Sequence, residues 1–83
     1  MICQAIMTPS VQRFGEKLRS LRLRKGFTLK TLAIALGLKA HGYISEIENG
    51  KKMPTVELVI GIARLFEVTT DQLLMDELEI PEE

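Results

Sequence analysis

The chain has 83 residues, 46% of them hydrophobic, and its 11 basic and 11 acidic residues give a formal net charge of zero. This length fits one small domain with a marginal hydrophobic core, and the longest apolar run after the first few residues is far shorter than the roughly 20 residues that span a bilayer. Because no basic leader precedes a long apolar segment and the single Cys3 cannot form an internal disulfide, we expect a soluble, cytoplasmic protein without a membrane partner.

The neutral total conceals an asymmetry of charge along the chain. Residues 13–52 carry ten Lys or Arg against three Glu, a balance of +7, whereas residues 53–83 carry one Arg against eight carboxylates, a balance of −7. A basic half of this kind is typical of a surface that binds a polyanion. The alternative, two solvated faces of opposite sign that attract each other, stays open on charge alone.

Apolar residues at helical spacing predict the first two helices. The first is expected to run from Ser10 as N-cap to Gly26 as terminator, and its apolar face is formed by Val11, Phe14, Leu18 and Leu21. The second is shorter, from Thr28 as N-cap to Gly37 as terminator, with an apolar face of Leu29, Leu32, Ala33 and Leu36.

A third helix is predicted from near His41 to the Asn-Gly pair at 49–50. Its apolar stripe contains Glu48, and a carboxylate buried without a partner is costly. Arg22 lies beside the apolar stripe of the first helix and suits a bidentate contact with a carboxylate. We therefore predict an Arg22–Glu48 ion pair between the first and third helices. The alternative is that both side chains reach water at the margins of their stripes.

Two further helices complete the predicted domain. Thr55 opens the fourth, whose broad apolar stripe is characteristic of a mostly buried helix, and Thr69 with Gln72 has the spacing of a capping box that starts the fifth. Residues 77–83 are acidic and contain Pro81, so we interpret them as a tail. The expected layout is an N-terminal tail (1–9), one helical domain (10–76) and an acidic C-terminal tail (77–83).

The stretch from Val11 to Leu74 resembles the helix-turn-helix domain of the lambda-repressor and Cro type, the XRE family. The matching pieces, in order and at family spacing, are Thr28 with Leu32-Ala33, Gly37, Ile44-Ser45, Glu48-Asn49-Gly50, Pro54, Leu58, Ala63, Leu65, Val68 and Leu73. The resemblance implies an all-α fold of five helices, in which the second crosses the DNA backbone and the third lies in the major groove. It also implies a paired Arg and Glu at positions 22 and 48.

Two features depart from the family pattern. Leu29 stands where members commonly have a Gln that braces a phosphate, so one backbone clamp is missing. The segment between Gly37 and Ile44 is one residue longer than usual, and Ala40 replaces the small polar cap expected before the third helix.

The polar face of the third helix is expected to read base edges. His41 can donate to guanine or to a phosphate, Glu46 can accept from cytosine N4, Ser45 is adaptable, and Gly42 lets the backbone approach closely. Tyr43 flanks this face and can contact a thymine methyl or a phosphate; the alternative is a half-buried ring that packs on the second helix. For His41 the alternative is an ordinary surface histidine, and no second ligand at useful spacing supports a metal.

Residues expected to bind phosphate flank the second and third helices. Lysines, hydroxyls, an amide and a bare backbone N–H position a protein on DNA without specifying sequence. Arg13 and Lys17, at one end of the first helix, are expected to add to them; the alternative for each lysine is a merely solvated cluster. The main candidates are Thr28, Lys30, Lys39, Asn49, Gly50, Lys51 and Lys52.

These features predict a sequence-specific double-stranded DNA-binding regulator, a repressor of phage, plasmid or restriction-modification type, with no enzymatic activity and no cofactor. One helix reads too few base pairs to be selective, so we expect a homodimer on a two-fold operator. The expected interface lies in the acidic half, and the apolar segment 1–7 is a second candidate to extend it. Alternatives are a DNA-binding antitoxin with a toxin partner, and a protein-interaction module that has lost DNA binding. The interface residues are Leu74, Met75, Leu78 and Ile80.

Overall fold

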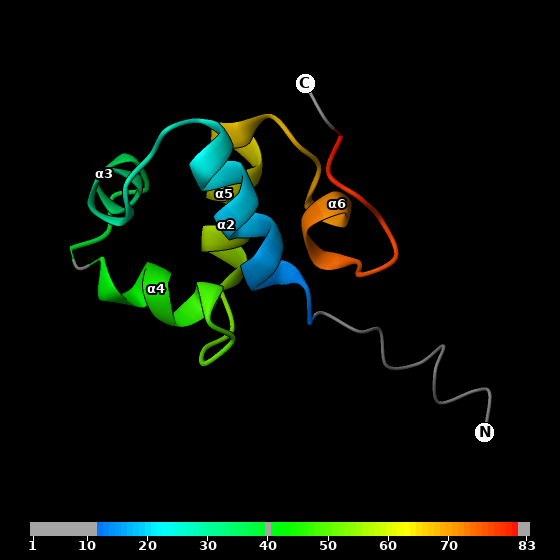
Figure 1. Cartoon of the computed structure of the whole chain (residues 1–83), viewed down its shortest axis with the longest axis horizontal. Coiled ribbons are helices and arrows are strands. Elements are labelled where there is room, and N and C mark those ends of the chain that lie inside the picture. The colour runs from blue at the N-terminus through cyan, green and yellow to red at the C-terminus, as the bar shows by residue number, and fades with distance from the viewer. Residues whose placement is uncertain (1–11, 40, 82–83) are drawn as a thin grey trace.

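The computed structural model describes residues 12–39 and 41–81, and within these ranges the chain is all helical, with five helices and no strand. The helices are α2 (Phe14–Arg24), α3 (Leu29–Ala35), α4 (Gly42–Glu48), α5 (Val56–Phe66) and α6 (Thr70–Leu74). Figure 1 shows α2 and α5 in the centre, with α3 and α4 on one side and α6 on the other. The predicted five-helix, all-α architecture is confirmed. None of the helices in the described part is long and apolar enough to cross a membrane.

Three of the helices begin where the sequence predicted. The hydroxyls of Thr28, Thr55 and Thr69 each accept a hydrogen bond from the backbone N–H three residues later, at 3.0, 3.1 and 3.0 Å. This contact satisfies one of the N–H groups that the first turn of a helix leaves without a partner. The three caps therefore set the starts of α3, α5 and α6 through local contacts alone.

The predicted start of the first helix is wrong. Helix α2 begins at Phe14, and its N-cap residue Arg13 makes no side-chain cap; Ser10 lies outside the described residues. The carboxylate of Asp76 instead accepts hydrogen bonds from the backbone N–H groups of Gln12 (3.0 Å) and Arg13 (2.9 Å). A negative charge at this end also suits the helix dipole. The cap comes from a residue far along the chain, which local sequence patterns do not reveal.

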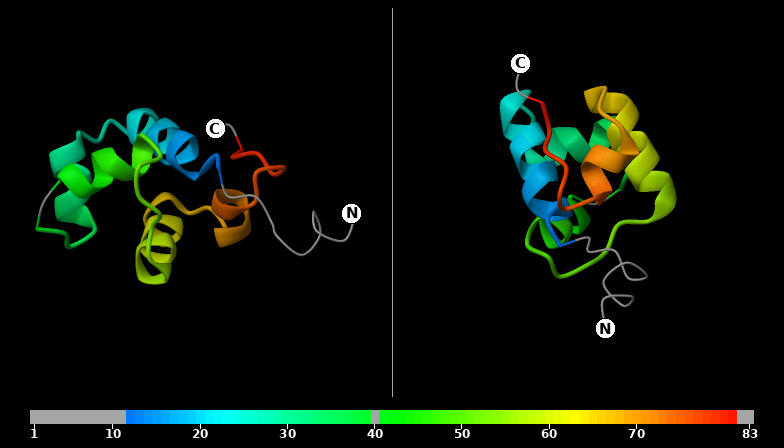
Figure 2. Two further views of the ribbon diagram at one scale, coloured as in Figure 1. Left: turned by 90° about the horizontal axis from the view of Figure 1, so that it is seen from below. Right: turned by 90° about the vertical axis from the view of Figure 1, so that its right-hand side faces the viewer.

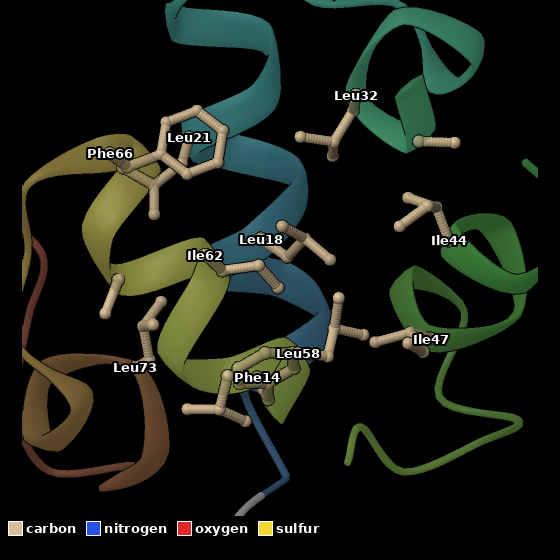
Figure 3. Packing of buried hydrophobic residues seen from close by; sticks show 13 residues of the cluster. Phe14, Leu18, Leu21, Leu32, Ile44, Ile47, Leu58, Ile62, Phe66 and Leu73 are labelled. Atoms are coloured by element: carbon tan, nitrogen blue, oxygen red, sulfur yellow. The ribbon is translucent and has the colours of Figure 1, made fainter. Parts of the chain in front are cut away.

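The hydrophobic core joins all five helices (Figure 3). Phe27 and Phe66 add an edge-to-face contact, with ring centroids 5.8 Å apart, between the α2–α3 connection and the end of α5. The core holds α3 and α4 firmly against the central helices. The buried residues are Phe14, Leu18, Leu21, Leu32, Ala33, Ile44, Ile47, Leu58, Val59, Ile62, Ala63, Phe66 and Leu73.

Helix α2 packs closely against the last turn of α4 at Gly15. A Cβ atom at this position would clash with the backbone carbonyl oxygens of Ile47 and Glu48, and it would lie only 2.7 Å from the Glu48 oxygen. Real Cβ atoms do not approach a backbone oxygen this closely, so a larger residue would force the helices apart. Gly15 therefore determines how near the last turn of α4 lies to α2.

The segment after α6 lies along α2, as the right-hand view of Figure 2 shows. Arg13 donates to the backbone carbonyl of Asp76 (2.8 Å) and to both carboxylate oxygens of Glu79, and Arg24 donates to the carbonyl of Pro81 (2.8 Å). Ile80 packs half-buried against the core. The residues expected to form an acidic tail are thus anchored to α2 as far as Pro81.

Candidate nucleic-acid interface

Helices α3 and α4 form a compact pair joined by a tight turn. Gly37 has a φ of +75°, a left-handed conformation that favours glycine, and it allows Leu38 N–H to donate to the Ala33 carbonyl at 2.8 Å. Leu32 of α3 and Ile44 of α4 are fully buried, and in Figure 3 both side chains point into the shared core. The turn and the shared core together hold α4 against α3.

Helix α4 has the two faces that the sequence predicted. Ile44 and Ile47 are buried in the core, whereas His41, Gly42 and Asn49 are exposed. A helix turns by about 100° per residue, so side chains on the far side from Ile44 and Ile47 are presented to solvent together. His41 is the N-cap residue of α4, and it makes no side-chain cap hydrogen bond. Its imidazole is therefore left at the exposed tip of the helix.

The ion pair between Arg22 and Glu48 is present and buried. Arg22 Nε lies 2.7 Å from Glu48 Oε2 and Nη2 lies 3.2 Å from Oε1, while Nη1 donates to the Phe27 carbonyl at 3.1 Å. The side chains are only 10% and 3% exposed, respectively. Both carboxylate oxygens are satisfied by a planar, bidentate contact. The pair ties α2 to the last turn of α4 on the side opposite the exposed face.

Glu46 lies on the half-exposed flank of α4 and contacts a lysine of the following turn. Lys52 Nζ is 3.5 Å from Glu46 Oε1, and the two side chains are about half exposed. An exposed pair of this kind is weak, worth on the order of 0–1 kcal/mol. Water or a nucleic-acid phosphate can therefore compete for Lys52, and Glu46 keeps its ability to accept a hydrogen bond from a base.

Ser45 and Tyr43 are both half-buried. The ring of Tyr43 packs against the hydrophobic core, which is the arrangement that the sequence left as the alternative for this residue. Part of the Tyr43 surface stays exposed to solvent.

Most of the residues predicted to bind phosphate are exposed. In Thr28 the hydroxyl is occupied, because it accepts from Thr31 N–H and contacts the Thr31 hydroxyl at 3.1 Å. The expectation that the Gly50 backbone N–H is available to a phosphate is wrong. It donates to the Ile47 carbonyl at 3.1 Å within the turn that ends α4. The exposed candidates are Thr28, Lys30, Lys39, Asn49, Gly50, Lys51 and Lys52.

The expectation that Lys17 adds to phosphate binding is wrong. Lys17 is buried, and its Nζ donates to the backbone carbonyls of Gln72 (2.6 Å) and Met75 (2.7 Å) at the end of α6. A cation at a helix C-terminus satisfies carbonyls that the helix leaves without partners. Arg13 is likewise engaged by Glu79 and Glu16. Both side chains bind the C-terminal part of this domain, so the basic surface is smaller than the charge count suggested.

The residues predicted to form a dimer interface have different surroundings. Leu74 and Ile80 both pack half-buried against the chain's own core, and Leu74 also lines an apolar hollow. Met75 is half-buried and Leu78 is exposed. The sequence reasoning passed over Met53 and Val56, whose apolar side chains are exposed beside Leu74. Among the described residues, no group of His, Cys, Asp and Glu could hold a metal ion.

The sequence of the chain is similar to that of known transcriptional regulators. A family model described as helix-turn-helix matches residues 18–73. The chain is 34% identical over 61 residues to the prophage-derived HTH-type transcriptional regulator YonR of Bacillus subtilis, covering 74% of this chain and 56% of that protein. It is 41% identical over 64 residues to the HTH-type transcriptional activator BcrR of Enterococcus faecalis, covering 77% of this chain and 31% of that protein.

A solved structure is similar along nearly its whole length. The restriction-modification controller protein C.AhdI of Aeromonas hydrophila superimposes with a TM-score of 0.68 at 28% identity, and the match covers 77% of this chain and 96% of that one. The chain spans about half of YonR and a third of BcrR, so it corresponds to only part of each of those regulators.

Proposed function

The chain belongs to the helix-turn-helix family of the lambda-repressor and Cro type, and from this premise we propose that it binds double-stranded DNA in a sequence-specific manner and regulates transcription. The observation that supports this most is the two-faced α4. Its buried side is fixed by Ile44, Ile47 and the Arg22–Glu48 pair, and its other side offers polar side chains to a groove.

Helix α4 is the element that enters the major groove in this proposal. His41, Ser45 and Glu46 contact base edges, Gly42 allows close approach, and Tyr43 contacts the rim of the groove. The exposed Asn49, Lys51 and Lys52 follow directly and bind the phosphate backbone, while Thr28, Lys30 and Lys39 bind it from the α3 side. The N–H of Gly50 already donates to the Ile47 carbonyl, so it does not bind phosphate. Instead, the absence of a side chain at Gly50 lets the DNA backbone approach the turn closely.

The regulator is a homodimer on a two-fold operator in this proposal. One α4 contacts too few base pairs to select a site, whereas two copies about 34 Å apart read two half-sites on the same side of the duplex. It is a non-enzymatic, cytoplasmic protein of the phage, plasmid or restriction-modification control type, in keeping with the similarity to YonR and C.AhdI.

The proposal is tested by fluorescence anisotropy with a labelled duplex of mixed sequence at a series of salt concentrations. We expect binding whose affinity falls steeply and linearly with the logarithm of salt concentration, because binding releases counterions from DNA. A protein that shows no affinity for the duplex at low salt would contradict it and would favour a protein-interaction module that has lost DNA binding.

A further inference from the structure

A hollow lies between the start of α2 and the turn that joins α4 to α5, and its volume is about 230 Å³. Gln12, Phe14 and Gly15 line it on the α2 side, and residues from the end of α4 and from the turn line the opposite wall. Figure 1 and the right-hand view of Figure 2 both show the turn and the start of α2 at the same end of the molecule. The hollow is therefore formed by two segments that lie far apart in the sequence.

Both walls of the hollow are held by contacts within the protein. On the α2 side, the Asp76 carboxylate accepts from the Gln12 N–H at 3.0 Å. In the turn, the Gly50 N–H donates to the Ile47 carbonyl at 3.1 Å. The packing of Gly15 against the last turn of α4 sets the separation of the two walls. The hollow thus has a defined shape before any ligand binds.

Hydrogen-bond donors and apolar surface lie together at this hollow. Gln12 is exposed, and because Asp76 takes its backbone N–H, the side-chain amide is the donor that it offers to a ligand. Lys52 is also exposed and supplies an ammonium group from the turn. Met53, which is 65% exposed, supplies apolar surface next to Lys52. An amide donor and a cation suit an anion, and Met53 suits an apolar group attached to that anion.

The backbone of DNA has this combination of groups. Each unit joins a negatively charged phosphate to a deoxyribose whose ring carbons are apolar. Side-chain amides and lysines are among the groups that contact phosphate oxygens in complexes with DNA. The hollow also adjoins the turn that carries Lys51 and Lys52, which the proposed function already places against phosphates.

The carboxylates near the hollow do not prevent the binding of an anion. Glu46 lies 3.5 Å from Lys52 in a half-exposed contact, which is weak enough for a phosphate to replace it. The Asp76 carboxylate beside Gln12 has both oxygens engaged, since each accepts from a backbone N–H at the start of α2.

We propose that this hollow binds one sugar-phosphate unit of the DNA backbone. Gln12 donates to a phosphate oxygen from the α2 side, Lys52 contacts the same phosphate from the turn, and Met53 packs against the deoxyribose. The proposal rests on the proposed function and adds to it a contact from α2, which lies outside the α3–α4 pair. This contact adds affinity and positions the protein along the duplex without selecting a sequence.

A gain of charge at Gln12 tests the proposal. Gln12→Lys places a second ammonium group at the phosphate, so the slope of log affinity against log salt should become steeper by about 0.9. Ser20→Lys is the matched control, because it adds the same charge at another exposed position of α2, beside Glu79 and Ile80 of the C-terminal segment. It should leave the slope as in wild type. Fluorescence anisotropy with the duplex of mixed sequence measures both slopes.

Removal of the amide should act on affinity alone. Gln12→Ala should weaken binding to every duplex by roughly 10-fold, because one hydrogen bond to a charged group is lost. It should leave the salt slope unchanged, since glutamine carries no charge. Ser20→Ala is the control and should bind as wild type does.

Uncharged phosphates give an independent readout. On a duplex selected from a random pool, single phosphates are replaced in turn by methylphosphonates. At one position, wild type should lose affinity and Gln12→Ala should lose much less, because both changes remove the same contact. Losses that add independently at every position would contradict the proposal.

Other results would also overturn the proposal. If Gln12→Lys and Ser20→Lys changed the slope equally, net charge would explain the effect and the hollow would bind no phosphate. Circular dichroism shows whether the helices of each variant are intact, and Gln12→Arg, with the same expected slope, replaces a Gln12→Lys that has lost helix content. Wild type that binds DNA while the Gln12 variants behave like the Ser20 controls would contradict this proposal alone. Wild type without affinity for any duplex would contradict the proposed function and this contact with it.

Discussion

Arg22 on α2 and Glu48 at the end of α4 face each other in a buried bidentate contact, with Nε 2.7 Å from Oε2. Because each charge is out of water, removal of either one leaves the other without a partner. We expect Arg22→Ala or Glu48→Ala to lower the free energy of unfolding by about 3–5 kcal/mol. Urea denaturation at neutral pH measures this change in the free energy of unfolding.

A double variant provides the control for this pair. Arg22→Met with Glu48→Leu replaces both charges by smaller apolar side chains, and we expect it to regain most of the stability that either single variant loses. Losses under about 1 kcal/mol in both alanine variants would show instead that the charges reach water.

The close approach of α2 and α4 at Gly15 gives a second prediction. On helix propensity alone, Gly→Ala in a helix should stabilise by about 0.5–1 kcal/mol. At Gly15 the new methyl meets the carbonyl oxygens of Ile47 and Glu48, so we expect a net loss of about 1–3 kcal/mol. Gly42→Ala is the matched control, because nothing lies within 4 Å of a Cβ there. Equal stability of the two variants in thermal or urea unfolding would refute this account of α2–α4 packing.

Lys51 is expected to act on DNA affinity without acting on sequence preference. Lys51→Ala should weaken binding to all duplexes alike and reduce the slope of log affinity against log salt by about 1 for each phosphate that the ammonium group neutralises. Arg64→Ala removes the same charge from the exposed surface of α5 and should leave the slope unchanged. If the two variants changed the slope equally, the effect would come from net charge and Lys51 would bind no phosphate.

Glu46 is expected to determine which base pair the protein prefers at one position of its DNA site. Glu46→Ala should relax selectivity at one base pair by about 1–3 kcal/mol, because the variant has no acceptor for cytosine N4. Competition between duplexes that differ at single positions measures this. A uniform gain in affinity for every duplex would contradict this role. It would mean that Glu46 only repels phosphate and competes with it for the Lys52 ammonium group.

The segment after α6 should respond to acid. The hydrogen bonds from Arg13 lower the pKa of the Glu79 carboxyl below its ordinary value of 4.5. Since the folded state has the lower pKa, this contact stabilises fully at pH values above the ordinary pKa, and the contribution is lost as the pH falls through the folded value. The difference in stability between wild type and Glu79→Gln should therefore be larger at about pH 7 than at about pH 3. If wild type and Glu79→Gln differed in stability by the same amount at both pH values, the Arg13–Glu79 contact would not be the cause.

Local patterns predicted most of the helices, because their determinants are local. Thr28, Thr55 and Thr69 cap the helices they precede through contacts three residues away, and Gly37 ends α3 through a conformation that the residue type itself favours. The Arg22–Glu48 pair was predictable for a different reason, since a carboxylate on an apolar stripe requires a cation.

Contacts between distant segments were not predictable in this way. Lys17 has the sequence features of a surface lysine, yet it is buried because the end of α6 offers it two carbonyls. Asp76 caps α2 from the other end of the domain, and Gly15 is small because α4 lies against it. In each case the determining neighbour is more than 30 positions away, so no periodicity or capping pattern records it.

Selection of bound duplexes from a random pool, followed by sequencing, tests most directly whether α4 reads DNA. The proposed function predicts one enriched motif with two-fold symmetry, whose half-sites are centred about 10–10.5 bp apart, and whose preferred bases change at a defined position in Glu46→Ala. Failure to enrich any sequence over the starting pool, or a motif that Glu46→Ala and changes at His41 and Ser45 leave identical, would contradict it.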